Sequence, residues 1–489
     1  MQEAVLANGQ RIPYIVKPNP PRGGMKHTYF APDQSYVVQF YNDPNTANDR
    51  NLRERLEAII GRYNPTVTEQ EGGAIGNSEQ ASSYFSKLFC WPSAIVTSPE
   101  YGIICPTYPS NFFFSEKSSF DLDLDGQDKK SNWFTTRTRK YLHRSELGDF
   151  RSMFQISILL ARAIRRMHQA GLAHSDLSNN NVLIDPKTGT CVVIDIDSLV
   201  VPGLFLPEVI GTRGYIAPEV LATMMLDIHD PNRKFPSTYT DLHALPVLIY
   251  EYLFFRHPLL GPKIYNAESA EEDDFLALGS QATFLENPND HSNRPSDLKV
   301  TIQDLGPTLE KLFIRAFVDG LHMPNERPTA MEWEKGLVQA WDLLHACSNP
   351  RCEQKWFVLY NINKPVCPYC GTRLRNQEIV RLKLKTEVRG RTGQWLSIGE
   401  VDVVHNTPLF KWHFFSNVFP DEKADRTMVA YICKHEGEWL LVNQKVNGML
   451  SPNGNCVPPG QAILLRDGTV FRASREDRGL LIEVSITKV

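Results

Sequence analysis

Residues 174–197 read HSDLSNNNVLIDPKTGTCVVIDID, and this stretch decides how the rest of the chain is interpreted. It places a carboxylate at Asp176, an amide five residues later at Asn181, and another carboxylate at Asp195. Between Asn181 and Asp195, two short apolar runs are joined by a Lys-Thr-Gly turn, which predicts a β-hairpin. The sequence therefore predicts two carboxylates and one amide held by a short pair of strands.

This order of polar groups suits phosphoryl transfer. One Asp accepts or orients the proton of the attacking hydroxyl, while the Asn and the second Asp hold magnesium on the nucleotide phosphates. The stretch resembles the H-R-D-L-x-x-x-N catalytic loop and the D-F-G metal site of protein kinases. The resemblance implies that Asp176 is the catalytic base and that Asn181 and Asp195 are magnesium ligands.

Further motifs follow in the order found in kinases. Residues 211–219, GTRGYIAPE, resemble the end of an activation segment with its A-P-E motif. Asp241 resembles the buried Asp that opens the central helix of the large lobe, and Arg327 resembles the arginine that pairs with the A-P-E glutamate. The implied fold is α+β and bilobal, with a strand-rich kinase small lobe at 1–108 and a helical large lobe at 109–345.

The small lobe departs from the usual kinase pattern. The strand SYVVQF at 35–40 carries Gln39 where most kinases have the phosphate-binding lysine. Upstream, a short turn contains Gly23 and Gly24 and is followed by Lys26. This resembles kinases in which a lysine of the glycine-rich loop reaches the same phosphates, and it predicts that Lys26 replaces the strand lysine. A solvent-exposed loop lysine and poor nucleotide binding are the alternative.

Two other parts of a nucleotide site can be placed. The phosphate-binding lysine normally pairs with a helical glutamate. The predicted helix NDRNLRERLEAIIGRY offers Glu57, which we prefer, and Glu54 one turn earlier. The segment between the lobes would set Pro106, Thr107 and Tyr108 against the adenine.

Three residues limit the resemblance. Ser175 replaces the arginine that usually precedes the catalytic Asp, so we expect the common phosphorylation switch to be absent. Ser178 replaces a lysine that is usual in serine/threonine kinases, which resembles small-molecule kinases. Asp197 replaces the glycine of D-F-G and is either an extra metal ligand or an outward-facing residue.

Four cysteines are clustered within residues 346–375. Cys347-x4-Cys352 is followed after fourteen residues by Cys367-x2-Cys370. Two turns that each present a thiolate pair are typical of a structural zinc ribbon, in which four protein ligands exclude water. Two reduced cysteine turns without metal are the alternative.

Residues 376–489 are predicted to form an all-β domain. Alternating segments such as EWLLVNQKV and GTVFRAS are separated by Asn-Gly and Asp-Gly turns. The L-x-D-G turn before the last strands resembles a forkhead-associated (FHA-like) β-sandwich. In that family loop residues bind phosphothreonine, but a scaffold or protein-docking role stays open here.

The amino-acid composition excludes some classes of binding partner. Lys+Arg 52 against Asp+Glu 56 gives a net charge of −4, without the basic excess of a nucleic-acid binder. No stretch of roughly 18 apolar residues predicts a membrane span, and no secretory leader is evident, so we expect a cytoplasmic protein without membrane or nucleic-acid partners.

The order of kinase, zinc ribbon and FHA-like domain resembles the bacterial kinases of the TerY-phosphorylation triad. These kinases are encoded beside a von Willebrand A domain protein and a metal-dependent phosphatase, which the resemblance implies as substrate and partner. The sequence thus predicts a serine/threonine protein kinase that uses ATP, Mg²⁺ (or Mn²⁺) and structural Zn²⁺. A small-molecule kinase and a nucleotide-binding pseudokinase scaffold are the alternatives.

Overall fold

The computed structural model describes residues 1–68, 79–115, 117–118, 122–205, 211–375, 377–420 and 427–489. The chain divides into two compact units. Unit 1 comprises Met1–Leu298 and Leu312–Glu334, and unit 2 comprises Lys299–Lys311 and Lys335–Val489.

Unit 1 opens with a six-stranded antiparallel sheet in the order β2-β1-β5-β6-β4-β3. Its strands are β1 (Gln2–Leu6), β2 (Arg11–Tyr14), β3 (Lys26–Phe30), β4 (Tyr36–Tyr41), β5 (Ala94–Ser98) and β6 (Gly102–Pro106). Helix α1 (Arg50–Ile60) buries Leu52 and Leu56 in a core shared with Ile95 and Ile103 of the sheet. Helix α2 (Glu79–Phe85) precedes β5. The sheet contributes residues of β3, β4 and β6 to one wall of the candidate site.

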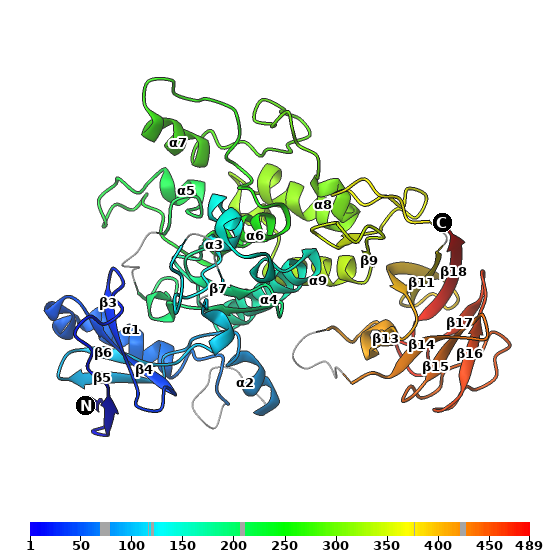
Figure 1. Ribbon diagram of the computed structural model, residues 1–489, viewed down its shortest axis with the longest axis horizontal. Coiled ribbons are helices and arrows are strands. Elements are labelled where there is room, and N and C mark those ends of the chain that lie inside the picture. Colours follow the sequence, from blue (N-terminus) through cyan, green and yellow to red (C-terminus); the bar gives the residue numbers. More distant parts are fainter. Residues whose placement is uncertain (69–78, 116, 119–121, 206–210, 376, 421–426) are drawn as a thin grey trace. The chain divides into compact units, whose positions relative to one another are not determined.

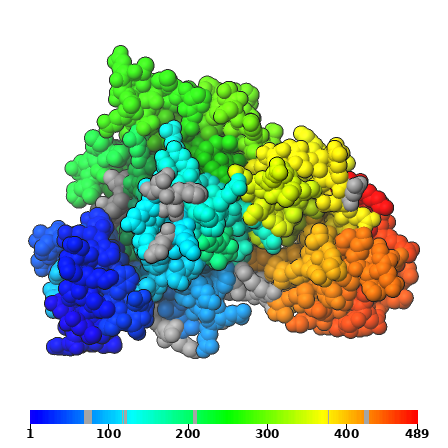
Figure 2. All heavy atoms as spheres, in the orientation of Figure 1, coloured from blue at the N-terminus to red at the C-terminus, as the bar shows by residue number. Residues whose placement is uncertain are grey.

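The rest of unit 1 is mainly helical and contains one two-stranded hairpin, β7 (Val182–Asp185) with β8 (Thr190–Val193). Figure 1 shows α4 and α6 in the centre of this region, beside β7. In Figure 2 the blue sheet region and the cyan-to-green helical region of unit 1 adjoin. The helices are α3 (Asn132–Thr135), α4 (Phe150–Gln169), α5 (Pro218–Leu221), α6 (Thr238–Phe254), α7 (Ala270–Leu278), α8 (Pro307–Ile314) and α9 (Ala330–Trp341), of which α8 and α9 cross the unit boundary.

Helix α4 follows from its sequence. Apolar residues recur every three to four positions, and the helix buries, among others, Phe154, Leu160 and Ile164. The Asp149 side chain accepts a hydrogen bond from the Ser152 backbone N–H and caps the first turn. The chain leaves the helix through Gly171 at φ 81°, a left-handed conformation that favours glycine. The helix thus ends just before the loop that carries Asp176 and Asn181.

Unit 2 contains a small hairpin and a β-sandwich. The hairpin pairs β9 (Leu344–Ala346) with β10 (Trp356–Val358). Two four-stranded sheets follow, in the orders β12-β11-β18-β17 and β13-β14-β15-β16. Side chains of both sheets share one apolar core, so the C-terminal β-sandwich is present as predicted. Its strands are β11 (Glu378–Glu387), β12 (Trp395–Val403), β13 (Pro408–Leu409), β14 (Ala430–His435), β15 (Glu438–Asn443), β16 (Ala462–Leu465), β17 (Val470–Arg472) and β18 (Leu481–Lys488).

Across the described ranges, no helix combines the length and the apolar character needed to cross a membrane.

Candidate active site

A cavity of about 760 Å³ lies between the sheet and the β7–β8 hairpin of unit 1. It brings together nearly all site residues expected from the sequence. Those lining it are Gly23, Gly24, Lys26, Pro106, Thr107, Tyr108, Asp176, Asn181 and Asp195. Glu57 is not among the described lining residues.

The catalytic loop is held in place through both oxygens of Asp176. Thr212 donates its hydroxyl to Asp176 Oδ1 at 2.7 Å, and Asn181 Nδ2 donates to Asp176 Oδ2 at 2.9 Å. The same amide nitrogen donates to the Asp176 backbone carbonyl at 2.8 Å. Asp176 and Asn181 therefore form one hydrogen-bonded group through Asn181 Nδ2, and the side-chain oxygen Oδ1 of Asn181 is the atom that could bind a metal.

Asp195 follows β8 with a backbone φ of 61° and ψ of 40°, in the left-handed region. Few residues other than glycine and Asn or Asp adopt this conformation, and such positions cluster at functional sites. The Ser198 hydroxyl donates to the Asp195 carbonyl at 2.7 Å and closes the turn. The Asp195 side chain is 38% exposed, so the turn presents a carboxylate to the cavity.

Lys26 begins β3 directly after the glycine-containing turn. Asn42 Nδ2 donates to the carbonyls of Gly23 and Gly24 at 3.2 and 3.1 Å and so fixes the turn. The Lys26 side chain is only 11% exposed, which contradicts the alternative of a solvent-exposed loop lysine. Gln39, on the neighbouring strand, also lines the cavity, but its amide carries no charge.

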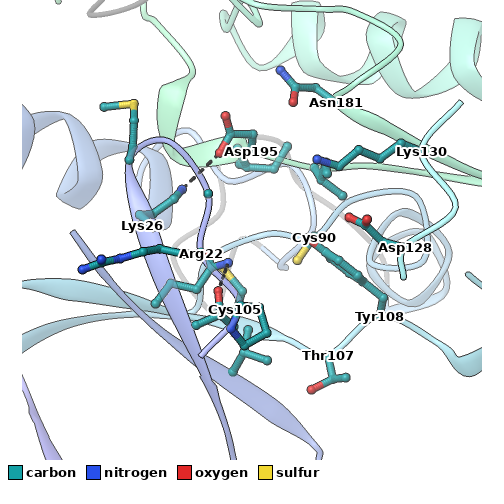
Figure 3. A pocket seen from close by; sticks show the side chains of 18 of the residues that line it. Arg22, Lys26, Cys90, Cys105, Thr107, Tyr108, Asp128, Lys130, Asn181 and Asp195 are labelled. Carbon is teal, nitrogen blue, oxygen red and sulfur yellow. Dashed lines mark hydrogen bonds and ion pairs between the residues drawn. The ribbon is translucent and has the colours of Figure 1, made fainter. Parts of the chain in front are cut away.

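Two carboxylates surround the Lys26 ammonium. Lys26 Nζ lies 3.1 Å from Asp195 Oδ1 and 2.5 Å from Asp197 Oδ1 (Figure 3 marks the first contact). Burial acts to lower the pKa of Lys26, but Asp197 and then Asp195 outweigh it and raise the pKa above its ordinary value. Lys26 is therefore a charged ammonium at the wall of the cavity.

Glu57 takes no part in this cluster. Helix α1 turns Leu52, Arg55, Leu56 and Ile59 inward, which leaves Glu57 exposed on the other side of the helix. The expected ion pair of Lys26 with Glu57 is replaced in the structure by the pairs with Asp195 and Asp197. Asp197 is buried, so it is not the outward-facing residue that was one alternative.

Two buried charged residues, Asp241 and Arg327, hold chain segments next to the cavity. Asp241 accepts the backbone N–H of His174 at 3.2 and 3.0 Å, and His174 Nε2 lies 3.0 Å from the Ile194 carbonyl. Arg327 donates to both carboxylate oxygens of Glu219 at 2.8 Å each. Arg327 thus makes the ion pair that the kinase resemblance predicts, and Asp241 is buried in the first turn of α6, as the resemblance also predicts.

Several lining residues were missed by sequence reasoning. Cys90, Asp128 and Lys130 all line the cavity, and Figure 3 shows Lys26 and Lys130 reaching into it from opposite sides. Lys130 arrives there because its backbone bridges to Leu183 of β7. No motif identifies these positions, because this pairing joins a loop to a distant strand.

The cysteine cluster belongs to unit 2. The four Sγ atoms of Cys347, Cys352, Cys367 and Cys370 all lie within 4.8 Å of one another. Burial acts to raise the pKa of Cys370, but hydrogen bonds from Thr372 and other donors outweigh it and lower the pKa to about 6. Four converging sulfur atoms, one of them readily ionised, form a donor set that fits zinc.

Comparisons with known proteins find similarity to protein kinases in part of this chain. Residues 131–335 match the family model of the protein kinase domain. The human anti-Muellerian hormone type-2 receptor is 31% identical over 139 residues, which cover 24% of this chain and 23% of the receptor. Serine/threonine-protein kinase PSK1 of Saccharomyces cerevisiae is 30% identical over 120 residues, which cover 22% of this chain and 8% of that kinase. The chain thus spans less than a quarter of these relatives.

Among solved structures, the kinase domain of a specific rhoptry antigen of Toxoplasma gondii is similar, with a TM-score of 0.40 and 14% identity. The similarity covers 69% of this chain and 85% of that one. Together, the family model and the motif order give residues 131–335 the fold of a protein kinase domain. A kinase domain implies the use of ATP, a divalent metal and a protein substrate.

The chain at Gly214 and Tyr215 is held by two titratable groups, the buried Glu251 and the half-buried His257. Tyr215 donates its hydroxyl to Glu251 at 2.5 Å, and His257 Nε2 lies 2.9 Å from the Gly214 carbonyl. Burial raises the pKa of Glu251 to about 7 and lowers the pKa of His257 to about 4. At neutral pH His257 is therefore uncharged, and Glu251 is partly protonated.

We predict that Glu251→Gln removes a pH dependence of stability. Since folding raises the pKa of Glu251 from 4.5 to about 7, the folded state binds the proton more tightly, and stability falls as pH rises through this window. As the pH rises from 4 to 8, the free energy of unfolding of the wild type should fall relative to that of the variant by up to about 3 kcal/mol. Chemical denaturation over this pH range measures it, and Glu268→Gln, at an exposed carboxyl, is the control. Parallel curves for variant and wild type would contradict the prediction.

Proposed function

We propose that this chain is a Mg-ATP-dependent serine/threonine protein kinase that transfers the γ-phosphoryl group to a hydroxyl of a partner protein. The supporting observation is one cavity lined by the base, the metal ligands and the buried lysine that the reaction requires, namely Asp176, Asn181, Asp195 and Lys26.

Each residue has a role that fits its contacts. Bound Mg-ATP supplies the phosphoryl group and the metal that offsets its charge. Asp176, oriented by Thr212 and Asn181, binds the substrate hydroxyl and accepts its proton. The carbonyl oxygen of Asn181 and the carboxylate of Asp195 are hard oxygen donors of the kind that magnesium prefers.

Lys26 and the segment between the lobes hold the nucleotide. The Lys26 ammonium, in place of the usual strand lysine, binds the phosphate oxygens beside Gly23 and Gly24. Pro106, Thr107 and Tyr108, which line the same cavity, would contact the adenine, and recognition by their backbone groups would make the side chains less important.

The remaining assignments rest on the resemblance to the TerY-phosphorylation triad. The substrate is a serine or threonine of a von Willebrand A domain protein, and a metal-dependent phosphatase reverses the reaction. The C-terminal sandwich is FHA-like, which is supported by its two sheets and by the Asp467-Gly468 turn between β16 and β17.

Asp176→Asn tests the catalytic proposal. The amide keeps the shape of the side chain but cannot accept the proton, so phosphorylation should slow by about 10²–10⁴-fold. Transfer from labelled ATP to the chain itself and to a general protein substrate measures the rate, while calorimetry checks that ATP still binds. Asp477→Asn, at an exposed carboxylate of unit 2, is the control. Undiminished transfer by Asp176→Asn would identify a nucleotide-binding scaffold with contaminating activity.

Lys26→Met tests the displaced lysine. The substitution keeps the apolar stem but removes the charge, and ATP affinity should fall by about tenfold or more, the effect of losing a charge-assisted contact. Gln39→Met, on the adjacent strand, should change ATP affinity much less. Titration calorimetry with ATP and magnesium measures both. A larger loss of ATP affinity in Gln39→Met than in Lys26→Met would instead assign the phosphate-binding role to the strand that carries Gln39.

We further propose that Cys347, Cys352, Cys367 and Cys370 bind one structural Zn²⁺. Cys367→Ser and Cys370→Ser should each lose stoichiometric zinc and lower the unfolding temperature of unit 2, because metal binding supplies folding energy to such a short ribbon. Elemental analysis and calorimetry of the purified chain measure these effects. Cys433→Ser in β14 should retain the metal. A wild-type chain that contains no zinc and does not respond to chelators contradicts this proposal.

A further inference from the structure

The strongest contact in the cavity joins Lys26 to Asp197, a residue for which the sequence left the role open. Both oxygens of Asp197 are occupied: Oδ1 lies 2.5 Å from Lys26 Nζ, and Oδ2 accepts the Tyr41 hydroxyl at 2.7 Å. The Asp197 side chain is 8% exposed, whereas that of Asp195 is 38% exposed. Both carboxylates line the cavity, but Asp195 is the more exposed one, whereas Asp197 is enclosed by its protein partners.

The sheet register sets this arrangement. Lys26 of β3 is directly opposite Tyr41 of β4, so the two groups that bind Asp197 are cross-strand neighbours. Tyr41 is in turn stacked on Tyr101, with ring centroids 6.0 Å apart and an interplanar angle of 22°. Asp197 is thus docked onto a preformed pair of side chains of the sheet.

The helix that usually supplies the partner of the lysine is unsuited to this task. The side chains that α1 buries are three aliphatic groups and the cation Arg55, while Glu54 and Glu57 are exposed. A lysine that binds phosphates still needs a fixed countercharge, because Asp195 shares its charge with the metal once it becomes a ligand. Asp197 is the carboxylate that remains.

We propose that Asp197 is the positioning residue that holds Lys26 for the nucleotide phosphates, in place of a helix glutamate, and that it is not a metal ligand. This inference rests on the proposed kinase function. It means that one short turn, residues 195–197, carries both the metal-binding carboxylate and the anchor of the phosphate-binding lysine. Correct placement of the lysine then depends on this turn and not on the position of α1.

The first test uses the full chain without nucleotide, and so does not depend on kinase activity. A double-mutant cycle with Lys26→Met, Asp197→Asn and the double variant measures thermal unfolding temperatures. The paired residues should show strongly non-additive shifts, with the double variant no less stable than the worse single variant. Additive shifts would overturn the pairing.

The second test separates anchoring from metal binding. With ATP and magnesium in titration calorimetry, Asp197→Asn should weaken ATP by about tenfold, adding Lys26→Met should cause little further loss, and Asp197→Glu should restore part of the affinity. Binding of adenosine and the magnesium concentration for half-maximal ATP binding should not change. A raised magnesium requirement would overturn the proposal in favour of a metal ligand.

The exposed carboxylates of α1, Glu54 and Glu57, are the alternative partners of Lys26 and provide matched control variants. Glu57→Gln and Glu54→Gln should each leave ATP affinity within about twofold of wild type, since exposed charges contribute little. A loss in either variant equal to that of Asp197→Asn would return the anchoring role to α1 and overturn the inference. If the wild-type chain binds no ATP at all, the proposed function fails, while the unfolding cycle still decides whether the pair exists.

Discussion

The candidate site depends on one buried ammonium group. Removing a charge from water costs several kcal/mol unless an opposite charge and hydrogen bonds replace the hydration. Lys26 meets this requirement through Asp195 and Asp197, at 3.1 and 2.5 Å. Because the lysine belongs to the sheet and both carboxylates follow β8, the same contacts that keep the ammonium charged also join the sheet to the segment after the β7–β8 hairpin.

The same constraint explains the rest of the support around the loop. Arg327, which is buried, is matched by a bidentate contact with Glu219, and Asp241 is satisfied by backbone and imidazole donors. Glu251 is the informative exception, because its hydrogen bond from Tyr215 brings no positive charge. Burial therefore raises its pKa to about 7, so this carboxyl takes up a proton where the paired groups stay ionised.

The sequence could predict contacts between residues that lie close together in the chain, but not contacts between distant segments. Asp176, Asn181 and Asp195 flank one hairpin, so their order and its resemblance to kinase motifs predicted that they line one site. The four cysteines behaved in the same way, since two short turns present their sulfur atoms. The partner of Lys26 could not be predicted, because it depends on which face α1 turns to the core and on a contact 171 residues away along the chain. Lys130 was missed for the same reason, since its place is set by a backbone bridge to β7.

Ser175 shows how the turn that carries Asp197 is kept against the catalytic loop. In many kinases a phosphorylated activation loop is ordered by an arginine, which makes assembly of the site conditional on a new charge pair. Here the Ser175 hydroxyl donates to the Ser198 carbonyl at 2.9 Å, one residue beyond Asp197. A hydrogen bond between neutral groups needs no phosphate to form. The turn that bears the metal-binding carboxylate and the partner of Lys26 is therefore tied to the catalytic loop by contacts that the unmodified chain already contains.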